Sequence, residues 1–315
     1  MKVLLVRFSA IGDCVMAAYA ATAIRRQNPD AEIVWAAETR CCPVIDDVNL
    51  ANRVNEVPRD RWKKEHKILE PLRHFLSLRK VGFDYGFDFQ GHSKTAICLR
   101  LARPKVRWAA RATDEFARRL NPTLLHDPNI PEHEVELNMR LVRMWQPGLQ
   151  IPERPIMPTL ADERRKVRSL IRTEGRLVTI QTGAGADDKI VPPEHWAFVA
   201  RALIAEGFTV AAIGAPGDPR VDEPCVQNLV GALTLREAMA AVAESALHLA
   251  GDTGSGHIAA AYGIPLVSVF GPTPPERYRP WSPTASVLRD PSKATAAVSP
   301  DLILSAALAR LEGDK

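Results

Sequence analysis

The sequence has few cysteines, and none of them stands in a pattern that binds a metal or forms a disulfide framework. There are five, an odd number, and they form no CxxC motif and no Cys/His cluster. Disulfide-rich secreted domains and structural zinc sites both depend on such patterns. We therefore expect neither class of protein.

Long apolar runs are missing as well. The chain begins MKVLLVRFSAIGD, in which the apolar run is four residues long and too short for the core of a signal peptide. No other stretch reaches the length that a membrane-spanning helix needs. We expect the protein in the cytoplasm.

Two common ways of holding a nucleotide phosphate are also absent. No pair of aspartates has the Asp-x-Asp spacing that commonly holds a metal ion against a nucleotide diphosphate, and no GK[ST] follows a glycine-rich loop. We therefore expect neither a metal-dependent diphosphate site nor a Walker A loop.

Basic residues are concentrated in the first half of the chain. Residues 1–150 carry 24 Lys+Arg against 18 Asp+Glu, whereas the remainder carries 17 against 19. The excess either marks an anionic partner of the first half or simply solvates its surface. Since the basic residues are not interleaved with aromatic ones in any recognisable binding motif, nucleic acid is not the expected partner.

Strands alternate with helices along the chain, which predicts open parallel sheets. We expect strands over residues 2–7, 31–37, 53–57, 84–89, 106–109, 177–181, 209–214, 246–250 and 266–270. Five Pro and Gly residues between positions 147 and 158 suggest a linker. The prediction is two Rossmann-like α/β domains, 1–150 and 151–315, facing across a cleft, with a last helix over 300–311 that could pack back across the hinge.

The most informative stretch is residues 251–272, GDTGSGHIAAAYGIPLVSVFGP, in which a strand, a tight glycine-rich turn and a helix follow one another. Glycines allow a close approach of the backbone, and the N–H groups at the start of a helix attract an anion. This favours a diphosphate site, although such a turn also simply joins two elements. Asp252 either binds ligand or ties the turn, and His257 either shapes a pocket or packs in the core.

Two further turns follow strands of the second half. In residues 181–189, QTGAGADDK, Lys189 would supply a point charge to a diphosphate or would remain a solvated surface lysine. Asp218, after the next strand, would accept hydrogen bonds from a ribose or would cap its own turn.

The first half offers one candidate base and one basic run. Asp13 follows the first strand, where it either starts the helix or takes a proton from an attacking hydroxyl. Residues 59–67, RDRWKKEHK, are either a solvated face or a loop that meets a phosphorylated or carboxylated acceptor.

Taken together, five motifs in order make the chain resemble a known family. They are SAIGD at 9–13, FDFQG at 87–91, HEVELN at 133–138, DDK at 187–189 and DTGSGH at 252–257. The chain resembles the ADP-heptose lipopolysaccharide heptosyltransferases, glycosyltransferase family nine, and is closest in pattern to heptosyltransferase I. The resemblance implies a GT-B fold, an N-terminal acceptor domain, a C-terminal donor domain and inverting, metal-independent transfer of heptose from ADP-heptose to the Kdo/heptose inner core of lipopolysaccharide.

The resemblance also implies roles for individual residues. Asp13 would be the catalytic base. The donor would be bound by Thr182, Gly183, Lys189, Asp218, Asp252, Thr253, Gly254 and His257, with Asp218 standing where many members have a glutamate. The acceptor would be bound by Arg61, Lys63, Lys64 and Gln90. A lipid-linked acceptor would bring the protein to the cytoplasmic face of the inner membrane.

Other functions remain open at this point. The same architecture serves transferases and epimerases that use other nucleotide sugars, and a binding protein that has lost catalysis would keep the fold. The acceptor, the linkage and the oligomeric state are not determined by the sequence.

Overall fold

The computed structural model describes residues 1–67, 69–121 and 131–312. The chain forms two compact units, Met1–Pro158 and Thr159–Lys315. The division falls at the end of the proline-rich segment, whereas the sequence analysis placed it after residue 150.

The first unit is built on a parallel sheet of five strands in the order β3-β2-β1-β4-β5. The strands are β1 (Lys2–Val6), β2 (Glu32–Glu38), β3 (Arg53–Val57), β4 (Tyr85–Asp88) and β5 (Val106–Ala109). The central strand β1 is almost wholly apolar and buried, as a strand covered on both faces must be. All five carboxyl ends lie at one edge, so residues that follow these strands gather there.

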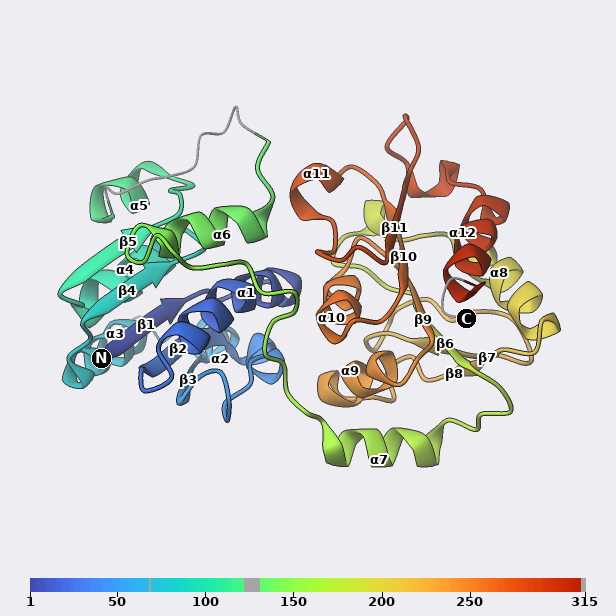
Figure 1. Ribbon diagram of the computed structural model, residues 1–315, viewed down its shortest axis with the longest axis horizontal. Helices are drawn as coiled ribbons and strands as arrows, with labels where there is room; N and C mark the ends of the chain where they lie inside the picture. Colours follow the sequence, from blue (N-terminus) through green and yellow to red (C-terminus); the bar gives the residue numbers. More distant parts are fainter. Residues whose placement is uncertain (68, 122–130, 313–315) are drawn as a thin grey trace. The chain divides into compact units, whose positions relative to one another are not determined.

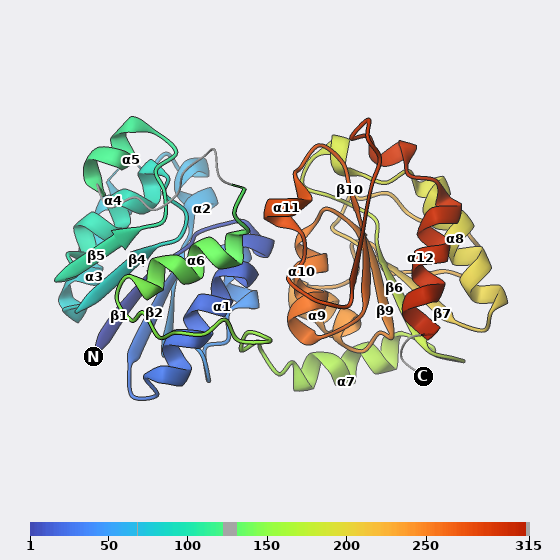
Figure 2. The same ribbon diagram turned by 45° about the horizontal axis from the view of Figure 1, so that its top comes forward.

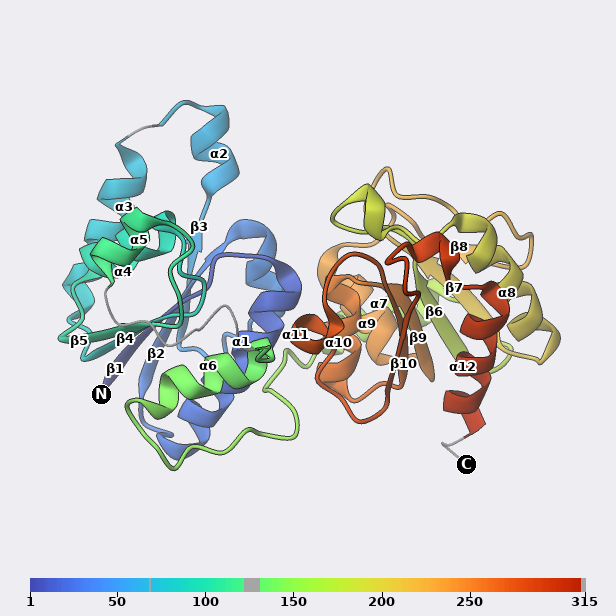
Figure 3. The ribbon, with the colours of Figure 1, turned by 90° about the horizontal axis from the view of Figure 1, so that it is seen from above.

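Helices cover both faces of this sheet (Figures 1 and 3). One layer contains α1 (Ile11–Gln27) packed along α6 (Glu134–Arg143), and the other contains α3 (Glu70–Leu78) packed along α4 (Ser93–Ala102). The short helices α2 (Arg59–Lys64) and α5 (Glu115–Leu120) were not predicted, because a six-residue helix is too short to show a helical period.

Helix α1 begins at Ile11, with Ala10 as its N-cap residue. Asp13 therefore lies inside the first helical turn. Its carboxylate accepts a hydrogen bond from the Ala10 N–H at 2.9 Å, which satisfies a backbone donor at the start of the helix.

The second unit has a parallel sheet of six strands in the order β11-β10-β9-β6-β7-β8. The strands are β6 (Leu177–Gln181), β7 (Thr209–Ile213), β8 (Gln227–Asn228), β9 (Leu247–Gly251), β10 (Leu266–Phe270) and β11 (Ala285–Arg289). The two edge strands, β8 and β11, were missed. Both are only half-buried, so neither has the continuous apolar run that identified the inner strands.

Two helical layers flank the second sheet (Figures 1 and 2). The first contains α7 (Ala161–Leu170), α9 (Leu235–Ala243) and α10 (Gly254–Tyr262), and the second contains α8 (Pro193–Ala205) and α12 (Pro300–Glu312). A short helix, α11 (Pro275–Tyr278), follows β10.

The apolar face of the last helix packs within the second unit. Ile303, Ala307 and Leu311 are spaced four residues apart and are buried in the core of the second unit, against α8 and the sheet. This apolar stripe is buried within its own unit, and a contact of the last helix with the first unit stays a prediction. Within the described ranges, no helix has the length and apolar character needed to cross a membrane.

Candidate active site

Asp13 lies at the carboxyl edge of the first sheet and is held on both carboxylate oxygens. One oxygen lies 2.6 Å from an Nη of Arg7, and the other accepts the Ala10 N–H. About a quarter of the Asp13 side chain is exposed, 24%. The residue therefore fills the structural role at the helix start while presenting an oriented carboxylate to solvent.

Arg7, the partner of Asp13, was not identified from the sequence. It follows directly after β1, is buried, and also donates to the Phe89 carbonyl at 2.6 Å. Burial works to lower the pKa of Arg7, but the charges of Asp13 and Glu134 outweigh it and raise this pKa above its ordinary value. The sequence did contain a signal for Arg7, because an arginine that directly follows an almost wholly apolar strand is unusual.

Gln90 lies behind the turn that carries Asp13. Its side-chain carbonyl accepts the Phe8 N–H at 3.0 Å, and its amide nitrogen lies 3.5 Å from the Ser9 hydroxyl. Gln90 is itself placed by Asp88, whose carboxylate accepts the Gln90 N–H at 2.9 Å. Burial raises the pKa of Asp88 to about 6. Gln90 thus supports the turn, and its contact with an acceptor stays a prediction.

A second acid lies at this edge: Glu38, at the end of β2, forms ion pairs with three basic side chains. Its carboxylate lies 2.8 Å from Lys94, 3.2 Å from Arg59 and 3.5 Å from Arg40. Burial works to raise the pKa of Glu38, but Lys94 and Arg59 hold it below its ordinary value. This cluster was missed because Arg59 and Lys94 lie 21 and 56 positions from Glu38 in the sequence.

The basic run forms α2 and the turn after it. Arg61, Lys63 and Lys64 are exposed, while Trp62 between them is buried in a core cluster that also contains Phe8. The predicted loop is therefore a helix anchored by its tryptophan, which presents its cations to solvent.

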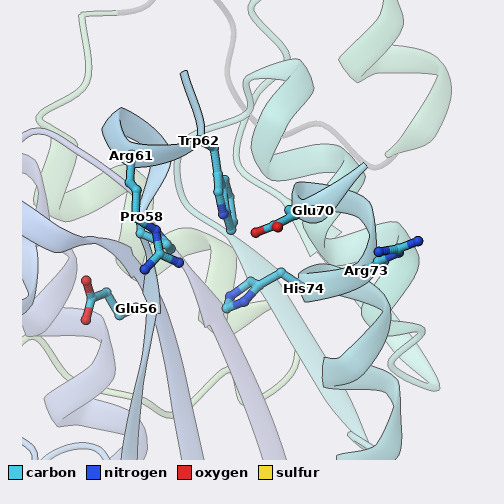
Figure 4. Close-up of a pocket in the computed structure, with 7 residues that line it drawn as sticks. All are labelled: Glu56, Pro58, Arg61, Trp62, Glu70, Arg73 and His74. Carbon is cyan, nitrogen blue, oxygen red and sulfur yellow. The ribbon is translucent and has the colours of Figure 1, made fainter. Parts of the chain in front are cut away.

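A pocket of about 550 Å³ lies beside this helix. It is lined by Glu56, Pro58, Arg61, Trp62, Glu70, Arg73 and His74 (Figure 4). In Figure 4 the Glu70 carboxylate reaches toward the Trp62 ring, while Arg73 points away from it. Of the predicted acceptor residues, Arg61 contributes to this pocket.

In the second unit, the structure brings together two of the predicted donor residues. The Lys189 ammonium lies 2.7 Å from the Asp252 carboxylate, which is buried at the end of β9. The turn that carries Lys189 passes so close to the sheet that a Cβ on Gly251 would lie 2.9 Å from the Lys189 carbonyl. Glycine at position 251 therefore permits the approach that joins the two charges.

Asp218 and Thr182 make local contacts. The Asp218 carboxylate accepts the Ala215 N–H at 2.7 Å, and it occupies the space where a Cβ on Gly183 would lie. Thr182 is buried, and its hydroxyl donates to the Ile213 carbonyl at 3.4 Å. Asp218 caps its own turn, and the ribose contact stays a prediction.

Helix α10 starts directly after Thr253, with Gly254 in its first position. The Thr253 hydroxyl lies 2.8 Å from the Ser255 hydroxyl and does not cap the helix. His257 is buried in the first turns of the helix. The described parts of the chain contain no group of three or more His, Cys, Asp or Glu side chains placed to hold a metal ion.

Comparison with known proteins places this arrangement in a family. The model of glycosyltransferase family 9 (heptosyltransferase) matches residues 72–305. Lipooligosaccharide heptosyltransferase 2 of Haemophilus ducreyi is 26% identical over 318 aligned positions, covering 92% of this chain and 88% of that protein. Lipopolysaccharide heptosyltransferase 1 of Pseudomonas aeruginosa is 27% identical, covering 87% of this chain and 80% of that protein.

Solved structures agree in fold. The structure of E. coli ADP-heptose LPS heptosyltransferase II superposes with a TM-score of 0.83 at 22% identity, covering 100% of this chain and 99% of that one. E. coli heptosyltransferase WaaC with ADP-2-deoxy-2-fluoro heptose gives 0.78 at 23% identity, with both chains fully covered. With the family model matching most of its length and these structures sharing its two Rossmann-like units, the chain belongs to glycosyltransferase family 9, the heptosyltransferases, and has the GT-B fold.

Proposed function

We propose that this glycosyltransferase moves heptose from ADP-heptose to the Kdo/heptose inner core of lipopolysaccharide, with inversion at the anomeric carbon. The names of the relatives support the sugar and the class of acceptor, and the WaaC complex supports an ADP-linked donor. The observation that carries the mechanism is the Asp13 carboxylate, which is oriented by Arg7 and Ala10 and remains partly exposed.

In the proposed reaction, Asp13 accepts the proton of the acceptor hydroxyl as its oxygen attacks the anomeric carbon. The bond between that carbon and the ADP oxygen breaks, and its electron pair leaves with the diphosphate. Attack from the face opposite ADP inverts the configuration. Arg7 keeps the carboxylate in one orientation, which lowers the cost of reaching the transition state.

The second unit would bind the donor. Lys189 and the N–H groups at the start of α10 would stabilise the charge that develops on the leaving diphosphate. Asp252 would hold the Lys189 ammonium in place through their 2.7 Å contact. The remaining donor contacts in this proposal come from Thr182, Gly183, Asp218, Thr253, Gly254 and His257, and no metal ion takes part.

The first unit would bind the acceptor. Arg61, Lys63 and Lys64 offer exposed positive charge to the carboxylates and phosphates of a Kdo-containing lipid, and Gln90 supports the turn beneath the reacting hydroxyl. A lipid-linked acceptor implies action in the cytoplasm, at the membrane surface.

The test is an assay of purified protein with ADP-heptose and a Kdo-lipid acceptor. Asp13→Asn should lower kcat by roughly 10²–10⁴-fold, the usual contribution of general base catalysis, while ADP affinity measured by calorimetry stays near the wild-type value. Asp47→Asn, which alters an exposed aspartate of the same unit, should behave like the wild type. Retained turnover in Asp13→Asn would refute the base. Consumption of another nucleotide sugar in place of ADP-heptose would refute the donor.

A further inference from the structure

A buried histidine in the middle of β9 has both ring nitrogens bound to hydroxyl groups. His248 is fully buried between Leu247 and Leu249. Its Nδ1 lies 2.9 Å from the Thr179 hydroxyl, and its Nε2 lies 2.9 Å from the Ser255 hydroxyl. An aliphatic residue would be ordinary at such a position, so the imidazole needs an explanation.

The two hydroxyls extend into a chain of polar groups that crosses the unit. On one side, Thr179 on β6 lies 3.3 Å from the Ser245 hydroxyl, which donates to the Val242 carbonyl at 2.7 Å in α9. On the other side, Ser255 lies 2.8 Å from the Thr253 hydroxyl at the start of α10. The chain therefore links the end of one helix to the beginning of the next through the sheet.

The Val242 carbonyl fixes the direction of every hydrogen bond in this chain. Because Ser245 gives its proton to that carbonyl, its oxygen accepts from Thr179, and the Thr179 oxygen must accept from Nδ1–H of His248. Burial lowers the pKa of His248 to about 3, so the ring is neutral.

A neutral ring that is protonated at Nδ1 has an unprotonated Nε2. This nitrogen needs a donor, and Ser255 supplies its hydroxyl proton. The Ser255 oxygen then accepts the proton of Thr253. The Thr253 and Ser255 hydroxyls, both in the turn at the start of α10, therefore donate their protons along the chain toward His248.

The direction of these hydrogen bonds matters because the turn over residues 252–256 contains two glycines. Ser255 stands between Gly254 and Gly256, which add no side chain that could hold the backbone. Thr253, the residue before the helix, would ordinarily cap the first-turn N–H groups with its hydroxyl. Here the Thr253 hydroxyl bonds to Ser255 and does not cap the helix. We infer that the first-turn N–H groups serve a ligand.

We propose that His248 is a positioning residue for the donor: through Ser255 and Thr253 it holds the first turn of α10 in the orientation that binds the diphosphate of a nucleotide sugar. The inference rests on the proposed donor site and adds to it the residue that orders its helix start. His248 itself would not touch the ligand.

The experiment measures ADP affinity by calorimetry and steady-state kinetics for both substrates. His248→Leu and Ser255→Ala should each weaken ADP binding roughly tenfold or more, which is the order of effect expected when a buried hydrogen-bond partner is removed. The KM for the acceptor should not change. The double variant should bind ADP about as well as whichever single variant binds it less tightly, because both substitutions remove the same His248–Ser255 hydrogen bond.

A matched control separates positioning from stability. Leu249→Ala shortens a buried side chain of the same strand without touching the polar chain. It should lower the melting temperature while ADP affinity in the folded protein stays near the wild-type value. Equal losses of ADP affinity in Leu249→Ala and His248→Leu would overturn the proposal.

The position of the proton on the His248 ring provides a second test of the proposal. In ¹⁵N spectra of the wild type, the His248 ring should be neutral with its proton on Nδ1, and a proton on Nε2 would overturn the inferred direction of the chain. If His248→Leu binds ADP as tightly as a wild type that binds it well, the positioning role fails and the donor site stands. If the wild type itself does not bind ADP, the donor site fails, and the role of His248 fails with it.

Discussion

At the scale of single residues, the carboxylate of Asp13 depends on Arg7. The guanidinium contacts both Asp13 and the Phe89 carbonyl, a geometry that a planar fork of donors suits and a single ammonium does not. The two groups are not interchangeable here, although both carry a positive charge.

We expect Arg7→Lys to fold and to lose activity. A lysine keeps the buried charge but cannot hold the Asp13 carboxylate and the Phe89 carbonyl together, so kcat should fall about tenfold or more while ADP affinity is retained. Kinetics with both substrates, beside calorimetry for ADP, provide the measurement. Arg26→Lys on the exposed face of α1 is the control. An unchanged kcat in Arg7→Lys would show that orientation of Asp13 does not matter.

Residue identities were easier to predict than residue partners. Asp13, Lys189 and Asp252 follow strands in recognisable motifs, which is why the sequence nominates them, and their roles stay predictions. That Lys189 contacts Asp252, or that Arg7 reaches the Phe89 carbonyl, depends on sheet order and on approaches across 63 and 82 positions of the chain. A single sequence contains no direct signal for such contacts.

At the scale of elements, α2 is a short helix whose only buried member is Trp62. Trp62 packs edge-on against Phe75 at 6.1 Å, and Phe75 stacks on Phe8 at 5.8 Å, so the helix is attached to the strand end that precedes Asp13. Its exposed cations can therefore be changed without disturbing the core.

Neutralising the exposed cations of α2 should weaken use of an anionic acceptor. We expect Arg61→Gln/Lys63→Gln/Lys64→Gln to raise the KM for the Kdo-lipid acceptor severalfold, and to flatten the dependence of kcat/KM on salt, because these charges attract the acceptor through solvent. ADP affinity should not change. Arg118→Gln/Arg119→Gln on α5 removes exposed charge elsewhere in the unit as a control. Equal weakening of ADP binding would contradict the division of roles.

The predicted elements differ in accuracy for a physical reason. Inner strands such as β6 and β10 are buried and mostly apolar and are bounded by turns, and their limits were predicted correctly. Strand β11 is half-buried along its whole length, and α2 buries one residue, so neither has a pattern that separates it from a loop.

At the scale of the whole molecule, the two units share one architecture but bury titratable groups of opposite behaviour. In the first unit, Asp88 has a pKa of about 6, above its ordinary value of 3.8, because burial disfavours the charged form. In the second, burial lowers the pKa of His248 from 6.5 to about 3. In both cases burial favours the neutral form of the group in the folded unit, and unfolding exposes the group to water.

These shifts predict opposite responses to acid. Folded Asp88 binds its proton before the unfolded chain does, so the free energy of unfolding of the first unit rises as the pH falls from 7 to 4.5, by about 2 kcal/mol from this group. His248 is protonated first in the unfolded chain, so the second unit loses about 3 kcal/mol over the same range.

The second unit should therefore become the less stable of the two on mild acidification. Urea unfolding at pH 7 and pH 4.5, followed by hydrogen exchange resolved to peptides of each unit, measures the two transitions separately. We expect the midpoint of the second unit to fall at pH 4.5 and that of the first to fall less or to rise. In His248→Leu the acid sensitivity of the second unit should shrink, because the group that takes up the proton on unfolding is gone. An acid shift of the second unit that survives this substitution in full would assign the effect to its ion-paired carboxylates, such as Glu237 and Glu244, whose pKa values are lowered by Lys166 and by Arg168.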